Sequence, residues 1–372
     1  MFASLRADRA RIYQAADAGV KRVATPVRMA IAVAVLLAAA PALAGWAPQQ
    51  GDFTIHDFRF HDGAVLPDLR QHYTTLGDPK NPAVLVLHGT GGTGSGMLNP
   101  GFGGELFGPG QPLDAGRYFI ILPDSIGAGK SSKPSDGLRM KFPRYNYDDM
   151  VTAQYRLLTE GLHIHHLRLV VGNSMGGMMS WTWAAAYPGF MDAAAPLASQ
   201  PAMAARNWML RRMLIETIKA DPAWHGGDYA SQPPMLKIAQ VTFGLATSGG
   251  TLAWQQRAPS RAAADAIVDA QLAAPHSGDA NDTIYQFEAS RDYDVAPRLG
   301  RIKAWVLAIN SADDERNPNE TGTSVDALKR LAHGSLYLIP ASTATRGHGT
   351  TGNAAFWKDR LKSWLATVPA GG

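Results

Sequence analysis

The chain has 372 residues, 46% hydrophobic and 18% charged, which is typical of a packed globular protein rather than a disordered one. It contains no cysteine, which excludes disulfides, thiolate metal sites and a cysteine nucleophile. The formal net charge is +4, but residues 1–44 hold six basic and two acidic residues, so the rest of the chain carries equal numbers of each. No nucleic-acid partner is therefore expected.

The first 44 residues predict a secretion signal. Arg22 and Arg28 precede an apolar run over residues 29–40, and Pro41-Ala-Leu-Ala44 follows as an A-x-A cleavage pattern. The run is shorter than the ~20 residues that a membrane-spanning helix needs. We expect an exported protein, periplasmic or secreted, with no stable membrane span once the signal is removed; a tethered or frayed N-terminal helix is the alternative.

Strands and helices are predicted to alternate after an N-terminal edge pair of strands at 53–60 and 69–76. Continuous apolar runs are typical of buried parallel strands, and they fall at 83–87, 118–122, 167–171, 193–198, 302–309 and 335–339. Helices are expected at 147–161, 177–187, 324–333 and 354–367. The order predicts an α/β fold, a mostly parallel sheet with helices on both faces.

Residues 201–299 interrupt this alternation and predict a helical lid inserted into a core made of 45–200 and 300–372. Helical segments are expected at 204–220, 235–244 and 261–273, with no buried-strand pattern among them. Apolar side chains of the insertion should line its own core or a substrate pocket; they are Trp208, Met209, Met213, Trp224, Met235 and Phe243.

A nucleophilic serine is predicted at Ser174. Gly172-Asn-Ser-Met-Gly176 is a G-x-S-x-G pattern placed between a buried strand and a helix, where a sharp turn exposes the serine hydroxyl. The glycine-rich loop 88–94 follows another strand and is expected to form an oxyanion hole. We expect the backbone N–H groups of Thr90 and Met175 as donors, with Gly91 as the alternative.

The catalytic base and acid should follow Ser174 in the order acid, then histidine. His348 lies between two glycines after the last strand, whereas His88 lies in the glycine loop and His333 precedes that strand. Both Asp313 and Asp314 follow the strand at 302–309. We favour Asp314, four residues before Pro318, without excluding its neighbour.

Two further motifs are not assigned a function. Gly129-Lys-Ser131 ends like a phosphate-binding loop, but the required first glycine is replaced by Asp124. The histidines at 163, 165 and 166 have no usual zinc spacing. No metal and no cofactor are expected.

These residues together resemble the homoserine O-acetyltransferase branch of the α/β-hydrolase superfamily. The resemblance spans about residues 60–366 and is carried by 172–178 (GNSMGGM), 142–161, 206–229 and 290–295. It implies an α/β-hydrolase fold with a helical lid and a catalytic triad of Ser174, Asp314 and His348. It also implies a substrate-binding arginine early in the lid, matched best by Arg211, and a homodimer.

The chain departs from the family pattern on both sides of the expected site. It has His88-Gly-Thr-Gly-Gly92 where the family has His-Ala-Leu-Thr-Gly, and Gly349 where the family has aspartate. Export would also separate the enzyme from acetyl-CoA. We therefore expect an esterase-like acyl hydrolase acting on a small ester or thioester. The alternatives are acetyl transfer to a hydroxyl acceptor, or an inactive hydrolase fold that serves as a binding module.

Overall fold

The computed structural model describes residues 47–275 and 278–371. The predicted secretion signal lies outside the described residues. No helix in the described ranges is both long and apolar enough to cross a lipid bilayer.

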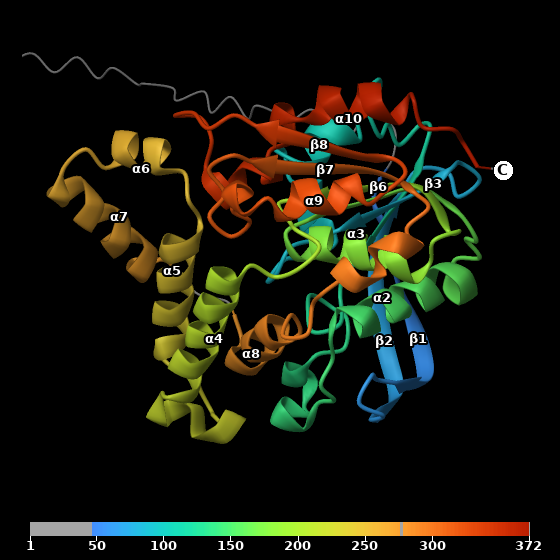
Figure 1. Cartoon of the computed structure of the whole chain (residues 1–372). Coiled ribbons are helices and arrows are strands. Elements are labelled where there is room, and N and C mark those ends of the chain that lie inside the picture. Colours follow the sequence, from blue (N-terminus) through green and yellow to red (C-terminus); the bar gives the residue numbers. More distant parts are fainter. Residues whose placement is uncertain (1–46, 276–277, 372) are drawn as a thin grey trace, which may run out of the picture. The chain divides into compact units, whose positions relative to one another are not determined.

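One eight-stranded sheet forms the centre of the molecule (Figure 1), in the order β1-β2-β4-β3-β5-β6-β7-β8. Strands β1, β2 and β4 pair antiparallel, and β3 to β8 are all parallel where they pair. The strands are β1 (Gln49–Arg59), β2 (Val65–Leu76), β3 (Ala83–Leu87), β4 (Phe119–Pro123), β5 (Leu167–Asn173), β6 (Met191–Leu197), β7 (Trp305–Ser311) and β8 (Gly334–Ile339). All eight were predicted, within a few residues at their ends.

Helices cover both faces of the sheet because its central strands are apolar on both sides. Leu85 and Leu87 of β3 pack into one buried cluster, while Val84 and Val86 pack into the cluster on the opposite face. The first face is covered by α2 (Tyr147–Arg156), α3 (Met175–Ala186) and α9 (Thr323–Lys329). The second is covered by α1 (Gly103–Leu106) and α10 (Lys358–Leu365).

The predicted helices are longer than the observed ones at several ends. The segment 147–161 is α-helical only to Arg156 and finishes in a π-turn over Leu157–Gly161. Residues 354–356 form a separate short turn before α10. The N-terminus of α2 is a capping box, in which Asn146 and Asp149 exchange side-chain and backbone hydrogen bonds.

Between β6 and β7 the chain is helical, and we call residues 201–299 the helical insertion. Its helices are α4 (Ala205–Lys219), α5 (Met235–Thr247), α6 (Thr251–Arg257), α7 (Arg261–Ala273) and α8 (Ala280–Glu288). The sequence did not predict α6 or α8. Leu214, Ile215 and Phe243 belong to a separate buried cluster within the insertion. The expectation that Met209 and Met213 line a core or pocket is wrong, because they are 65% and 59% exposed.

Candidate active site

Ser174 lies at a strained turn between β5 and α3. Its backbone has φ 59° and ψ −112°, which is unfavourable for a residue with a Cβ. Glycines allow the close packing around it: a Cβ at Gly172 would clash with the backbone of Gly176, and one at Gly176 would clash with Leu87. The turn places the serine hydroxyl at the carboxyl end of the sheet.

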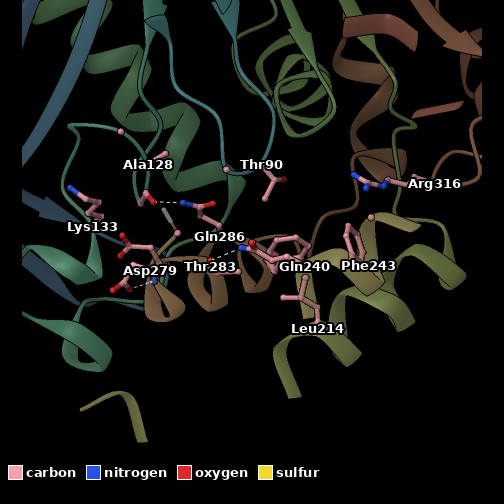
Figure 2. A pocket seen from close by; sticks show the side chains of 17 residues that line it. Thr90, Ala128, Lys133, Leu214, Gln240, Phe243, Asp279, Thr283, Gln286 and Arg316 are labelled. Carbon is pink, nitrogen blue, oxygen red and sulfur yellow. Dashed lines mark hydrogen bonds between the residues drawn. The ribbon is translucent and has the colours of Figure 1, made fainter. Parts of the chain in front are cut away.

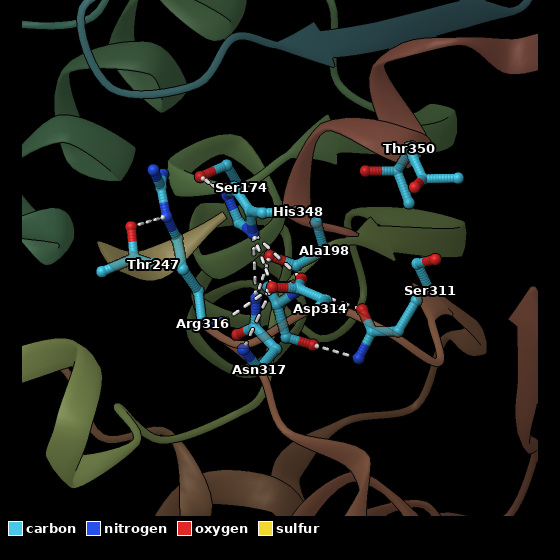
Figure 3. A network of polar contacts seen from close by, with 12 residues as sticks. Ser174, Ala198, Thr247, Ser311, Asp314, Arg316, Asn317, His348 and Thr350 are labelled. Carbon is cyan, nitrogen blue, oxygen red and sulfur yellow. Dashed lines mark hydrogen bonds and ion pairs between the residues drawn. The ribbon is translucent and has the colours of Figure 1, made fainter. Parts of the chain in front are cut away.

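His348 contacts this hydroxyl directly. Its Nε2 lies 2.8 Å from Ser174 Oγ (Figure 3), which is the distance of a hydrogen bond from the hydroxyl to the ring. The loop that carries it turns at Gly347, with φ 54°, and the His348 N–H donates to Ser248 O at 2.6 Å. The loop after β8 is thereby held against the carboxyl end of α5.

Asp314 completes the chain of contacts. Its Oδ2 lies 2.9 Å from His348 Nδ1, so the ring N–H donates to the carboxylate. Asp313 points elsewhere: it accepts hydrogen bonds from Ser311 Oγ and Thr345 Oγ1 and ties the loop after β7 to the loop after β8. The geometry thus selects Asp314 over Asp313 as the partner of the histidine.

Two neighbours of Asp314, absent from the sequence-based site, complete its surroundings. Asn317 Nδ2 donates to Asp314 Oδ2 at 3.0 Å and to Ala198 O at 2.8 Å. The backbone N–H of Arg316 donates to Asp314 Oδ1 at 2.8 Å. The only sequence signal for either residue is its place in the loop between Asp314 and Pro318.

Burial and charge set the protonation states of the pair. Burial lowers the pKa of His348; Asp314 opposes this, while the positive charges of Arg316 and Arg211 reinforce it. Burial opposes ionisation of Asp314, but the charge and hydrogen bond of His348 and the hydrogen bond from Asn317 outweigh it, so the pKa of Asp314 is lowered. A neutral imidazole beside an ionised carboxylate is the state that can accept a proton from Ser174.

The glycine-rich loop lies directly beside the serine. A Cβ added at Gly89 would lie 3.5 Å from the Ser174 Cβ. Met175 is the first residue of α3, so its N–H has no acceptor within the helix. The Thr90 hydroxyl is buried and has no hydrogen-bond partner among the described residues. Donors are therefore available where the predicted oxyanion hole would lie.

His88 is fixed as a structural residue of this loop. Its Nε2 accepts the N–H of Ser125 at 2.9 Å and its Nδ1 donates to Gly89 O at 2.8 Å. Both ring nitrogens are used, and burial lowers the pKa of the ring. His88 joins the glycine-rich loop to the loop after β4 and does not contact the serine hydroxyl.

Arg211, the arginine implied by the resemblance, is only 1% exposed. It donates to Asn207 Oδ1 and Ser290 Oγ, and it lies over the Phe287 ring at 5.2 Å. Its charge acts on His348, but a role in substrate binding stays a prediction.

A cavity of about 540 Å³ lies between the sheet and the helical insertion (Figure 2). The glycine-rich loop 88–94 contributes Thr90 and Gly91 to its wall, and the loop after β4 contributes residues 127–129. The insertion contributes most of the rest, including Leu214, Gln240, Phe243, Gln286 and Phe287. The Gly129-Lys-Ser131 loop therefore borders the cavity through Gly129.

Comparison with known proteins agrees with this architecture. A family model described as alpha/beta hydrolase fold matches residues 82–341. The homoserine O-acetyltransferase of Thermobifida fusca is 38% identical over 211 residues, which cover 50% of this chain and 55% of that protein. The homoserine O-succinyltransferase of Magnetococcus marinus is 35% identical over 191 residues, covering 47% of this chain and 48% of that protein. The chain thus spans about half the length of the curated relatives it matches.

Solved structures share the fold at low sequence identity. The homoserine O-acetyltransferase from Bacillus anthracis has a TM-score of 0.75 at 21% identity, covering 87% of this chain and 99% of that one. An acetylester hydrolase from Corynebacterium glutamicum has a TM-score of 0.73 at 24% identity, covering 86% and 96%. The sheet order, the strained serine turn and the family match together show that the chain belongs to the alpha/beta hydrolase fold family.

Proposed function

We propose that the chain is a serine-dependent acyltransferase, which moves a small acyl group from an ester or thioester to a hydroxyl acceptor through an acyl-enzyme. The observation that carries the proposal is the pair of hydrogen-bond distances, 2.8 Å from Ser174 Oγ to His348 Nε2 and 2.9 Å from His348 Nδ1 to Asp314 Oδ2. A weak hydroxyl nucleophile needs such a base, and the base needs a partner that fixes its tautomer.

The proposed first half-reaction forms the acyl-serine. Ser174 Oγ attacks the carbonyl carbon while its proton passes to His348 Nε2, and Asp314 stabilises the resulting imidazolium. Backbone N–H groups of Thr90 and Met175 would hold the developing oxyanion. The C–O or C–S bond to the leaving group then breaks, and His348 returns the proton to that leaving group.

In the second half-reaction an acceptor hydroxyl takes the place of the leaving group. His348 removes the hydroxyl proton while the acceptor oxygen attacks the acyl carbon. His348 then returns the proton to Ser174 Oγ as the bond between this oxygen and the acyl carbon breaks, which regenerates the free enzyme. Relatives named homoserine O-acetyltransferase and O-succinyltransferase support a hydroxyl acceptor. They support the transferase more directly than the hydrolase expected from the sequence.

Hydrolysis is the second candidate, with water as the acceptor. Two observations favour it: Gly349 supplies no acidic side chain next to His348, and fold neighbours include proteins named as esterases. Export, which the N-terminal sequence predicts, would also favour water because acetyl-CoA is a cytoplasmic donor. A homodimer is proposed from the resemblance alone, and light scattering of the purified chain would test it.

The two candidates separate in one assay. Purified protein is given p-nitrophenyl acetate, with and without homoserine, and separately acetyl-CoA or succinyl-CoA with homoserine. Homoserine-dependent CoA release that is lost in Ser174→Ala supports transfer. Ester cleavage without CoA release supports hydrolysis. Folded protein that shows neither activity, and no labelling by a fluorophosphonate, would instead favour the binding-module alternative.

A further inference from the structure

A cationic side chain without a counter-ion lines the cavity. The Arg316 guanidinium forms part of the cavity wall together with Thr90 (Figure 2). Within residues 47–275 and 278–371, no carboxylate lies at ion-pair distance from it, and its two terminal nitrogens have no hydrogen-bond partner. The four N–H bonds of the two terminal nitrogens are therefore available to a molecule in the cavity.

The arginine is nevertheless held in place. Its Nε donates to Thr247 Oγ1 at 2.8 Å, and its guanidinium carbon lies 4.6 Å from the centre of the Phe243 ring. Its own backbone N–H binds the catalytic-acid candidate Asp314. Contacts through Nε and the ring face fix the plane of the guanidinium but leave its terminal N–H edge open.

The positive charge of Arg316 is unfavourable in its surroundings unless an anion binds beside it. Burial and repulsion from Arg211, partly opposed by attraction to Asp314, lower the pKa of Arg316 to about 10. The side chain is still charged at neutral pH. A part-buried cation with a second guanidinium nearby is stabilised when an anion binds beside it.

We propose that Arg316, whose backbone N–H binds Asp314, holds a carboxylate of the substrate in the cavity that Thr90 and Gly91 also line. The inference rests on the proposed acyl transfer and adds a substrate class: esters or thioesters whose acyl or alcohol part carries a negative charge. Arg316 is a binding residue in this account and takes no part in proton transfer.

The other end of the cavity is lined by carboxylates. Asp279 and Asp282 line it with Lys133, and Figure 2 shows Asp279 and Lys133 away from Arg316. Asp282 accepts two hydrogen bonds from Ser135, and Asp279 accepts one from Tyr229. Carboxylates at that end would repel an anion, so a charged substrate should enter with its negative group at Arg316. A single guanidinium matches one negative charge, which favours a carboxylate over a phosphate dianion.

Paired substrates test the charge directly. On the alcohol side, p-acetoxybenzoate is compared with its neutral amide, p-acetoxybenzamide. On the acyl side, the mono-p-nitrophenyl ester of adipic acid is compared with the corresponding ester of adipamic acid. Each pair differs in charge and little in shape, and uncatalysed cleavage is subtracted. The full chain is assayed as wild type, Arg316→Gln and Arg316→Lys.

A nearby arginine provides the matched control. Arg206→Gln also removes one positive charge, but Arg206 is exposed and paired with Glu315 at 2.6 Å. Thermal unfolding of each variant shows whether the fold is kept. The charge preference of the wild type is itself informative if Arg316→Gln fails to fold.

For one of the two pairs, we expect kcat/KM of wild type to be about 10- to 100-fold higher for the anionic ester than for the ester in which an amide replaces the carboxylate. This is the usual effect of a charge-assisted hydrogen-bonded pair. Arg316→Gln should lose that preference, because kcat/KM for the anionic substrate should fall about 10- to 100-fold further than kcat/KM for its uncharged partner. Arg316→Lys should keep part of the preference, and Arg206→Gln all of it. The pair that shows the preference tells which side of the ester carries the carboxylate.

Equal kcat/KM for both members of both pairs in wild type would overturn the inference, as would an equal loss on all substrates in Arg316→Gln. Neither result touches the proposed serine chemistry, which would be contradicted if Ser174→Ala cleaved the ester bonds of the two uncharged substrates as fast as wild type. In that event, calorimetric titration of p-hydroxybenzoate into wild type and Arg316→Gln still tests the anion site. Equal affinity in that titration would contradict it.

Discussion

The sheet core and the helical insertion differ in how firmly they are packed. Central strands such as β3 are buried along their whole length. The insertion has a small buried cluster of its own, α7 has no buried residue, and Met209, Met213 and Leu252 are more than half exposed. The core supplies Ser174, Asp314 and His348, whereas the insertion supplies most of the cavity wall. The proposed catalytic residues thus lie on the densely buried region, and most of the cavity wall lies on the more exposed one.

The two regions meet at the catalytic loops. The His348 N–H donates to Ser248 O, and Arg316 Nε donates to Thr247 Oγ1, both at the carboxyl end of α5. The insertion therefore also supports the loops that carry the proposed base and acid. Mutations in the two regions should reveal this division.

Ser174→Ala should reduce kcat by about 10⁴-fold or more, because no other described residue presents a hydroxyl to His348. The matched control is Ser180→Ala on α3, whose hydroxyl bonds only to the carbonyl of Gly176. The control should keep activity within about threefold, since it alters one intrahelical contact. Similar losses in the two variants would remove Ser174 from its proposed role.

Asp314→Asn should reduce kcat by about 10³- to 10⁴-fold, because an amide does not fix the His348 tautomer or stabilise its charged form. Asp313→Asn should cost less than about tenfold, since Asp313 only connects two loops. Steady-state kinetics of the two variants shows which aspartate supports His348. A greater loss at position 313 would reverse the assignment.

The pH profile should show a base with a lowered pKa. Burial and the charges of Arg316 and Arg211 favour neutral His348, against the opposing effect of Asp314. The ring therefore stays unprotonated below its ordinary value of 6.5, and kcat/KM should level off by that pH. Below the apparent pKa, activity should fall about tenfold per pH unit. Circular dichroism at each pH controls for unfolding, and an apparent pKa above 6.5 would contradict the account.

Phe243→Ala should change the relative kcat/KM for different acyl chains more than the rate of acetyl-ester cleavage. Phe243 lines the cavity, so its loss should raise kcat/KM for longer acyl chains relative to acetate by about tenfold. It is 6% exposed and packs edge-on against Phe287, so we also expect the free energy of unfolding to fall by about 3 kcal/mol. If the dependence of kcat/KM on acyl-chain length is unchanged in Phe243→Ala, the acyl group does not bind against Phe243.

Met213→Gln should have the smallest effect. The side chain is 59% exposed on α4, so we expect less than about 0.5 kcal/mol change in the free energy of unfolding and unchanged kinetics. Trp183→Ala in the core, at 0% exposure, should cost about 3–5 kcal/mol by comparison. Denaturant unfolding measures both, and a large effect at Met213 would mean that its exposed face is covered in solution.

Much of the core follows from the sequence because its signals are local. Continuous apolar runs predict the buried strands, and a G-x-S-x-G pattern between strand and helix predicts the Ser174 turn. His348 could be chosen from eleven histidines by its place after the last strand. These features depend on residues that are adjacent in the chain.

The features that sequence reasoning missed depend on contacts between distant segments. The sequence favoured Asp314 over Asp313 only by its distance from Pro318, and it is the turn of the loop that directs Asp314 to His348 and Asp313 to Thr345. Arg316 gives no periodic or motif signal, and its unpaired charge is visible only when the cavity is formed. The exposure of Met209 and Met213 was missed because an apolar side chain on a helix is usually buried.

Trapping of the acyl-enzyme would identify the nucleophile. Purified protein is mixed with p-nitrophenyl acetate, quenched in acid within the first turnover, and examined by intact mass and peptide mapping. We expect one added acetyl group, located on Ser174 and absent from Ser174→Ala. Acetylation of another residue, or turnover at an undiminished rate in Ser174→Ala, would exclude Ser174 as the nucleophile.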